Sequence, residues 1–321
     1  MKKIFLILAG SFWLFLGCNK MSTNNGVADE NIAAPTERHC ASYDVLQQQL
    51  QDDPSLAARM EAIERFTRDF EANPNLGRME GDVLVVPVVV NVLYRTNAEN
   101  ISDAQIQSQI DVLNEDFSAT NADYSRPTAF DAVKSGNTNI RFELAGTVRR
   151  STNKKSWQAN DGMKKSSQGG IDPTSPATTL NLWACTMSGG ILGYAQFPGG
   201  NPATDGVVIL NTAFGRVGSV QAPFDRGRTA THEVGHYFNL RHIWGDATCG
   251  NDLVSDTPQH NTYNFGCPSP THRSTCTGQP LEMTMNYMDY TDDACMYMFS
   301  AGQRTRMQAS FAPSGPRASL R

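Results

Sequence analysis

The sequence lacks the compositional features that would direct a protein to nucleic acid or into a membrane. It has no excess of basic residues, because 27 Lys and Arg stand against 32 Asp and Glu and give a formal net charge of -5. Binding to phosphate backbones needs a basic surface, so we expect no nucleic-acid partner. The apolar run at the N-terminus is shorter than the ~20 residues that a membrane span takes. We find no internal repeat, and 321 residues suffice for one sizeable core with a smaller appendage.

That N-terminal run, Ile4 to Leu16, follows Lys2-Lys3 and ends at Gly17-Cys18. A basic start, a short apolar middle and a small residue are typical of a secretory signal, here residues 1–18. Ending in Gly-Cys resembles a bacterial lipoprotein signal, in which Cys18 is lipidated and becomes the new N-terminus. The two alternatives are a lipid anchor on the cell envelope and ordinary cleavage with full release. Both predict an exported protein.

Cysteine is sparse, with seven residues in the chain, and export permits them to form disulfides. Four of them crowd between positions 249 and 295, which indicates two disulfides with three possible pairings. Cys185 lies in an apolar stretch and is predicted to be a buried small hydrophobe. The cysteines are Cys18, Cys40, Cys185, Cys249, Cys267, Cys276 and Cys295.

Residues 19–78 read as a linker followed by a pro-segment. The polar stretch to residue 38 has no periodicity and predicts a flexible tether. Residues 43–72 predict helix, and Pro54 opens a second helix within that range.

Residues 79–312 form the predicted catalytic domain, and 313–321 a frayed tail. Ser102 and Gln105 form a capping-box pattern at the start of a helix. Residues 149–170 predict a solvated surface loop, its lysines being a less favoured binding patch. The order of elements fits an α/β or α+β domain with a twisted sheet. Strands are expected at 83–90, 140–144, 179–185, 192–197 and 206–210, and further helices near 227–239 and 301–311.

The residues that carry chemistry are His232-Glu233-Val234-Gly235-His236. Positions four apart on a helix share one face, so both imidazoles can bind one metal ion. Glu233 projects beside the metal, where a base can take a proton from a metal-bound water.

A catalytic zinc ion takes three protein ligands and one water, and His242 supplies the third ligand. A straight helix would carry His242 away from the ion, so the chain must reverse between His236 and His242. Asn239 is the expected position of that reversal, because Asn adopts the left-handed conformation readily.

The stretch from His232 to His242 resembles the zinc motif HExxHxxGxxH of the metzincin peptidases, with Asn239 replacing the usual Gly. Residues 286–290, Asn-Tyr-Met-Asp-Tyr, resemble the Met-turn of the pappalysin branch of metzincins. The surrounding segments agree, and the resemblance covers roughly residues 80–312. They are Gly245-Asp246, Asp256-Thr257-Pro258, Gly266-Cys267-Pro268, Asp293-Ala294-Cys295-Met296 and Phe299.

This resemblance implies roles for several residues. Met288 is an apolar floor under the histidines, and Tyr290 stabilises the oxyanion, the alternative for Tyr290 being a structural tyrosine. The implied disulfides are Cys249–Cys276 and Cys267–Cys295, which staple a loop-rich C-terminal subdomain. The implied fold is a mostly parallel twisted sheet with an antiparallel edge strand.

Calcium is also implied for this branch, with Asp246, Asp252 and Asp256 as candidate ligands. Helix caps and turns are the alternative explanation for these aspartates. Residues 192–198 correspond to the edge strand over the cleft, where an extended peptide can add to unpaired backbone groups. Asp292 and Asp293 near the Met-turn suggest a basic substrate side chain after the scissile bond.

Cys40 follows Arg38-His39 in the pro-segment and has no obvious partner. Related pro-segments carry a cysteine switch, so the Cys40 thiolate is expected to occupy the fourth zinc position in the latent form. The alternatives are a free thiol and a mixed disulfide. Processing near Arg78 then exposes the zinc.

Together these features predict a secreted or surface-anchored zinc endopeptidase, made as a zymogen, monomeric, and acting on protein or peptide substrates. One alternative is a surface metal-binding interaction module without turnover, which the intact Glu233 disfavours. Another is a zinc hydrolase acting on a non-peptide amide.

Overall fold

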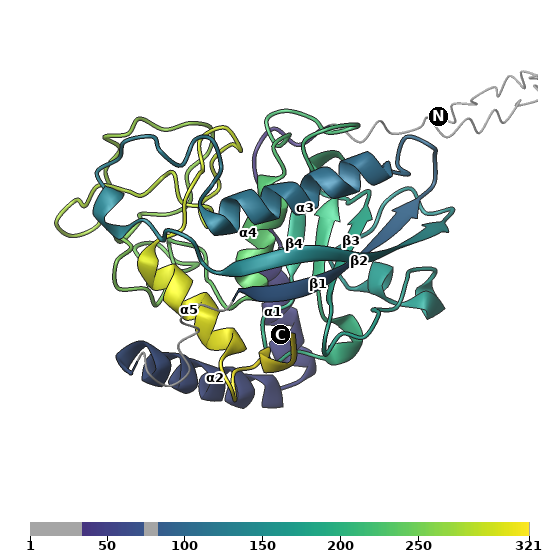
Figure 1. Ribbon diagram of the computed structural model, residues 1–321, viewed down its shortest axis with the longest axis horizontal. Helices are drawn as coiled ribbons and strands as arrows, with labels where there is room; N and C mark the ends of the chain where they lie inside the picture. The colour runs from purple at the N-terminus through teal and green to yellow at the C-terminus, as the bar shows by residue number, and fades with distance from the viewer. Residues whose placement is uncertain (1–33, 74–82, 321) are drawn as a thin grey trace, which may run out of the picture. The chain divides into compact units, whose positions relative to one another are not determined.

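A twisted five-stranded sheet organises the computed structural model, which describes residues 34–73 and 83–320. The strands lie in the order β2-β1-β3-β5-β4, and only β4 runs antiparallel to its neighbour among these pairs. Their bounds are β1 Leu84–Tyr94, β2 Ile140–Ser151, β3 Leu180–Cys185, β4 Gly193–Ala195 and β5 Val207–Leu210. The predicted mostly parallel sheet with an antiparallel edge strand is confirmed (Figure 1).

Five α-helices within the described residues surround the sheet. The α-helices are α1 Ser42–Asp52, α2 Ser55–Ala72, α3 Asp103–Ser118, α4 Arg228–Tyr237 and α5 Ala301–Phe311. Helix α3 packs on β2 and α4, while α2, in the segment predicted to be the pro-segment, lies against α5 (Figure 1). Short 3-10 turns follow at η1 Asp131–Val133, η2 Gly162–Lys164, η3 Ser166–Gln168, η4 Pro202–Thr204, η5 Asn211–Ala213 and η6 Ala318–Leu320. None of the described helices is long and apolar enough to cross a membrane.

Strands β3, β4 and β5 are buried on both faces and the Val-rich β1 nearly so, as its sequence predicts, whereas the edge strand β2 is largely exposed. One cluster packs α3, α4 and α5 against the sheet and includes Val88, Ile106 and Phe238. A second cluster contains the alternate residues of these strands, such as Trp183 in β3 and Tyr194 in β4. Trp157, which lies outside the strands, packs with them. Helix α4 packs on β4 and β5 within this core.

The predicted surface loop 149–170 is wrong in two respects. Strand β2 continues to Ser151, and the rest of the segment enters the second cluster through Trp157 and Met163. Lys164 is fully buried, and its ammonium group forms an ion pair with Asp161 at 2.9 Å. The polar composition of this segment led to the prediction of a solvated loop. Composition alone does not show which lysine will be buried beside a carboxylate.

The capping box at α3 is half formed. Ser102 accepts a bond from the amide of Gln105, as predicted. The Gln105 side chain instead donates to the backbone carbonyls of Asn211 and Phe214. It thereby ties α3 to the segment that follows β5, a contact that local sequence cannot report.

The C-terminal tail is not frayed over its described residues. Leu320 is buried, and the buried Arg317 forms an ion pair with Asp205 at 2.7 Å. Arg317 also donates to the backbone carbonyl of Tyr237 at the end of α4. The polar, Pro- and Gly-containing composition of 313–321 led to the wrong prediction.

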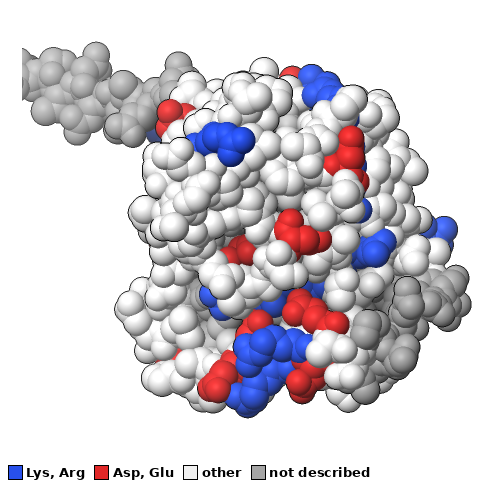
Figure 2. Space-filling view, turned by 90° about the vertical axis from the view of Figure 1, so that its left-hand side faces the viewer, with Lys and Arg blue, Asp and Glu red and all other residues white. Residues whose placement is uncertain are grey.

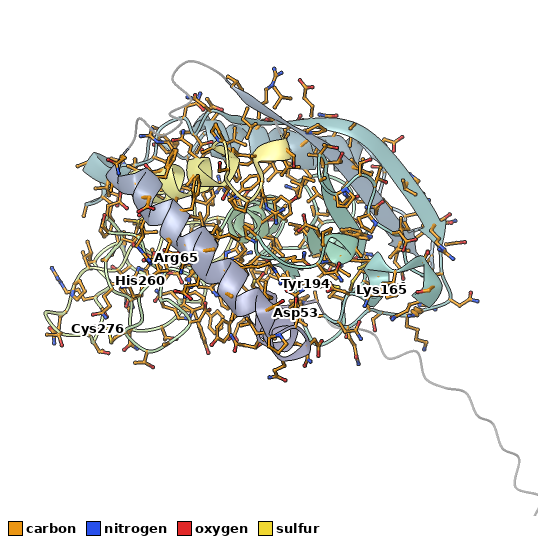
Figure 3. All side chains as sticks on the ribbon, turned by 90° about the horizontal axis from the view of Figure 1, so that it is seen from below. Asp53, Arg65, Lys165, Tyr194, His260 and Cys276 are labelled. Atoms are coloured by element: carbon orange, nitrogen blue, oxygen red, sulfur yellow. A yellow bond between two sulfur atoms is a disulfide. The ribbon has the colours of Figure 1, made fainter. Side chains whose placement is uncertain are left out.

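The loop-rich stretch after α4 is held by the two disulfides that the resemblance implied, Cys249–Cys276 and Cys267–Cys295. Cys185 is a fully buried free thiol in β3, as expected. Viewed from below in Figure 3, α2 crosses the molecule between this subdomain, where His260 and Cys276 lie, and the strands, where Tyr194 lies. The predicted signal at 1–18, Cys18, and the processing site near Arg78 lie outside the described residues.

Candidate functional site

Helix α4 brings the first two histidines together. His232 and His236 are fully buried, and their Nε2 atoms lie 3.2 Å apart on one face of the helix. Burial holds the pKa of each imidazole well below its usual value, which favours the neutral form that binds metal.

Asn239 reverses the chain as predicted. Its φ is +74°, in the left-handed region that Asn tolerates. The amide of Leu240 closes the helix end by donating to the carbonyl of Gly235 at 2.9 Å. The chain then returns His242, whose Nε2 lies 3.1 Å from that of His236.

The other ring nitrogens of the histidines are fixed by neighbouring oxygens. Nδ1 of His232 contacts the carbonyl of Tyr287 at 2.7 Å, and Nδ1 of His236 contacts that of Leu240 at 2.8 Å. Nδ1 of His242 contacts a carboxylate oxygen of Asp246. Such partners fix the tautomer and leave each Nε2 free to bind metal. Asp246 thus orients a histidine.

Met288 lies under α4, where the resemblance placed it. It is fully buried, and a Cβ built on Gly235 would lie 2.5 Å from its sulfur. The backbone carbonyl of Met288 also accepts a bond from the amide of Ile243, beside His242. Glycine is therefore the only residue type at position 235 that lets the Met-turn approach the helix this closely.

The N-terminal segment that the sequence predicts to be a pro-segment places Cys40 beside the histidines. The ligand atoms of Cys40, His232, His236 and His242 all lie within 4.8 Å of one another. Within the described residues, this is the one group of three or more such side chains that converges on a point suited to a metal ion. Two or more imidazoles with a thiolate are a donor set typical of zinc, so the residues present fit the ion.

Glu233 stands next to Cys40. Its Oε2 lies 3.2 Å from the Cys40 sulfur and accepts a 2.9 Å bond from the Ser42 hydroxyl. Burial raises the pKa of Glu233 to about 7, the range in which a general base works near neutral pH. Ser42 was missed by sequence reasoning, because nothing local marks a serine that meets Glu233 through the tertiary fold.

Residues 39–42 of the predicted pro-segment bond to the outer edge of β4. The amide of Leu192 donates to the carbonyl of His39, and the amide of Ala41 donates to the carbonyl of Gly193. The amide of Ala195 donates to the Ser42 hydroxyl at 2.8 Å. Residues 39–42 therefore lie where an extended peptide would add to the sheet.

Tyr290 reaches the same point from the Met-turn. Its hydroxyl donates to the carbonyl of Cys40 at 3.0 Å, and its ring lies 5.0 Å from that of His242. The donor is thus aimed at a backbone carbonyl located beside the histidines.

Arg38 fills a buried slot beside this centre. Its guanidinium pairs with Asp293 at 2.6 Å and donates to the Thr229 hydroxyl and to the carbonyl of Thr291. It also lies over the ring of Phe224. The sequence pointed to Asp293 through its place near the Met-turn, but the Arg38 side chain that meets it was not predicted.

The three predicted calcium ligands do not come together. Asp246 is engaged by His242, and Asp256 accepts bonds from the Ser300 hydroxyl and the Gly302 amide at the start of α5. Asp252 accepts bonds from Thr257 and from the amide of Val254. Helix capping, the alternative explanation, therefore describes Asp256.

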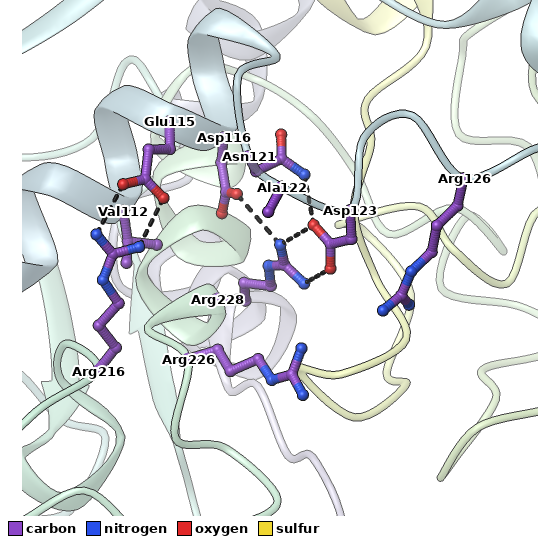
Figure 4. Close-up of a pocket in the computed structure, with 10 residues that line it drawn as sticks. All are labelled: Val112, Glu115, Asp116, Asn121, Ala122, Asp123, Arg126, Arg216, Arg226 and Arg228. Atoms are coloured by element: carbon purple, nitrogen blue, oxygen red, sulfur yellow. Dashed lines mark hydrogen bonds and ion pairs between the residues drawn. The ribbon is translucent and has the colours of Figure 1, made fainter.

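A cavity of about 300 Å³ is lined by charged side chains around the start of α4 (Figure 4). Arg228 begins α4 and pairs with Asp123 at 2.5 Å, with Asp116 nearby at 3.6 Å. Asp116 accepts bonds from Thr231 and from the hydroxyl of Tyr287. This network joins α3, α4 and the Met-turn and was invisible in the sequence.

The extended histidine motif, the reversal at Asn239, the Met-turn and the edge strand define a metzincin-type zinc peptidase. The M43 peptidase family, pregnancy-associated plasma protein-A, matches residues 185–312. Extracellular metalloproteases of Arthroderma benhamiae and Pyricularia oryzae are each 37% identical to the chain. Those matches cover 68% and 70% of this chain and 69% and 72% of the two relatives. The chain belongs to the M43 family of pappalysin-type peptidases.

Two solved structures of a related peptidase are similar to this chain. Mature mirolysin of Tannerella forsythia, in complex with a cleaved peptide, is 46% identical with a TM-score of 0.72 over 75% of this chain and 96% of that one. A promirolysin mutant from the same organism is 42% identical with a TM-score of 0.80 over 88% and 97%. The protein is a secreted zinc metalloendopeptidase made as a zymogen, and the interaction module is not favoured.

We predict that the buried ion pair of Arg228 contributes far more to stability than the exposed pair of Arg216. Arg228→Gln leaves Asp123 and Asp116 without their cation, so the free energy of unfolding should fall by about 3 kcal/mol. Arg216→Gln breaks a half-exposed pair with Glu115 and should cost less than about 1 kcal/mol. Urea unfolding of the full chain measures both, and equal losses would contradict the network.

Proposed function

We propose that His232, His236 and His242 hold the zinc ion, with Cys40 as the fourth ligand until the pro-segment leaves. The observation that carries this proposal is the convergence of these four ligand atoms within 4.8 Å, with Glu233 in contact with Cys40. The zinc ion would polarise the scissile carbonyl and lower the pKa of a water in the place that Cys40 vacates.

Glu233 and Tyr290 then carry the chemistry that belongs to the chain itself. Glu233 takes a proton from the attacking water and passes it to the nitrogen of the leaving amine as the C–N bond breaks. The Tyr290 hydroxyl, which donates to the carbonyl of Cys40 in the latent form, donates instead to the oxygen of the scissile carbonyl. A substrate backbone takes the β4 edge that residues 39–42 leave.

In this proposal, several contacts of the pro-segment keep the enzyme latent. The pro-segment covers the metal ligands with Cys40, bonds Glu233 through Ser42, occupies β4 and fills the slot with Arg38. Its α2 adds an ion pair between Glu64 and the buried Arg306 of α5. Charged side chains gather at the bottom of the face in Figure 2, the level at which Figure 1 shows α2 and α5.

We propose cleavage near Arg78 as the activating step, within residues 19–78 as linker and pro-segment. The mature enzyme is expected to act as a monomer. Cys18 remains the candidate for a lipid anchor, and release after ordinary signal cleavage is the alternative. Mass spectrometry of the exported N-terminus distinguishes a diacylated Cys18 from an unmodified end.

The central prediction concerns Glu233. Enzyme made as the full chain and activated by limited trypsin treatment should cut a mixed peptide library, and zinc chelation should abolish the cutting. Glu233→Ala should lower the rate by about 100- to 10,000-fold while zinc remains bound, because the general base is lost and the ligands are kept. Activity and bound zinc are measured on the same samples.

Two outcomes would overturn this reading. Zinc-loaded wild type that cuts no peptide after complete removal of the pro-segment would favour the metal-binding interaction module. Undiminished cutting by Glu233→Ala would remove Glu233 from its role.

The slot predicts specificity for arginine after the scissile bond. Once Arg38 has left, a substrate guanidinium can make the same bonds to Asp293, Thr229 and the carbonyl of Thr291. Asp293→Asn should lower the preference for Arg over norleucine roughly 100-fold, since a buried charged bond is lost. Thr229→Ala should lower it only about fivefold. The ratio of kcat/KM for paired peptides is the measurement.

The matched control is Asp292→Asn, which changes an acidic neighbour that makes no hydrogen bond to Arg38. It should keep the arginine preference within about twofold. Wild-type enzyme that cuts both paired peptides equally would contradict the assignment.

Calcium remains a prediction, with Asp252 as the carboxylate most suited to it. Its two oxygens retain lone pairs after accepting bonds from Thr257 and Val254, and loop carbonyls are hard ligands of the kind calcium prefers. Calcium should raise the melting temperature of wild type and not that of Asp252→Asn. Asp256→Asn, which weakens the cap of α5, should lower the melting temperature equally with and without calcium.

A further inference from the structure

Two exposed aromatic side chains lie side by side near the histidines and have no part in the roles assigned above. Tyr263 is 43% exposed and Phe265 is 38% exposed, and both belong to the loop-rich stretch after α4. Their ring centroids are 4.9 Å apart. Large apolar side chains that remain exposed next to one another mark a surface that binds something.

These rings continue into the catalytic centre. Tyr263 stacks on Tyr290 with ring centroids 5.4 Å apart, and Trp244 packs edge-on against Tyr290 at 4.7 Å. Trp244 in turn stacks on the ring of His242 at 4.3 Å. We call Phe265, Tyr263, Trp244 and Tyr290 the aromatic wall, which runs without a break from the loop surface to a metal-ligating histidine.

A cavity of about 410 Å³ separates the aromatic wall from the pro-segment. The pro-segment side of this cavity is made by residues 37–40, Tyr43 and Asp44. These residues flank the same stretch whose backbone bonds to β4 through His39 and Ala41. A chain that lies along β4 therefore has the strand on one side and this cavity on another.

The charges around the cavity favour an uncharged occupant in the active enzyme. Glu37, Arg38 and Asp44 leave with the pro-segment, and Asp246 is already bonded to His242. What remains is mostly ring surface, which gains most from contact with another flat or large apolar group.

We infer that the aromatic wall is a substrate-binding subsite for an aromatic or large aliphatic side chain close to the scissile bond. The inference rests on the proposed peptidase function and adds to the arginine slot, which lies on the Asp293 side of the centre. The wall selects by area and ring stacking, and the slot selects by charge.

The test profiles cleavage of a peptide library that keeps Arg after the scissile bond and varies the surrounding positions among Phe, Tyr, Leu, Ala and Asp. Enzyme activated from the full chain should prefer Phe over Ala about tenfold at one of these positions. Phe265→Ser should reduce that preference severalfold. Tyr263→Phe, which retains the ring, should keep the preference.

Leu144→Ser is the matched control, because Leu144 is 37% exposed on β2, at the opposite edge of the sheet from β4. It should leave the selectivity unchanged. Equal cutting of Phe and Ala peptides by wild type at every varied position, with the arginine preference intact, would overturn the subsite and leave the peptidase function standing. Loss of all cutting by wild type would instead count against the proposed function.

Discussion

Three imidazole nitrogens must meet at one point, and much of the surrounding structure follows from that requirement. Two of them share a helix face, but the third lies six residues further and a continuous helix would carry it away. Asn239 at φ +74° reverses the chain and returns His242 to within 3.1 Å of His236. The reversal in turn needs a floor, which Met288 provides by approaching a glycine that has no Cβ.

The latent state satisfies this centre with the protein's own chain. A buried histidine cluster with a carboxylate beside it is a reactive arrangement, and the pro-segment covers each part with a chemically matched group. Cys40 meets the ligands, Ser42 meets the base, Arg38 meets Asp293, and backbone amides and carbonyls meet the edge of β4. In the proposed function a substrate uses the same contacts, so that inhibition and recognition would share one surface.

The loop-rich subdomain shows how a segment with little regular structure can still form precise walls. Two disulfides close loops in it, and the Met-turn residues Tyr287, Met288 and Tyr290 belong to the core cluster that includes the sheet. A buried polar network also positions the Met-turn, because Asp116 of α3 bonds to Tyr287 and lies beside Arg228 of α4. The catalytic geometry is thus set by long-range polar contacts as well as by apolar packing.

Local spacing was enough to predict the histidine cluster, the adjacent Glu233, the reversal at Asn239 and the positions of the strands along the chain, because each depends on residues near one another in the sequence. Tertiary structure alone decided the rest. The buried Lys164 and the packed tail at Arg317 were predicted as solvated. Lys164 donates to the carbonyl of Thr204 and Arg317 pairs with Asp205, and local composition reveals neither of these long-range contacts. Ser42 at Glu233, Arg38 in its slot and the aromatic wall likewise join residues distant in sequence, and only the folded chain brings such groups within contact distance.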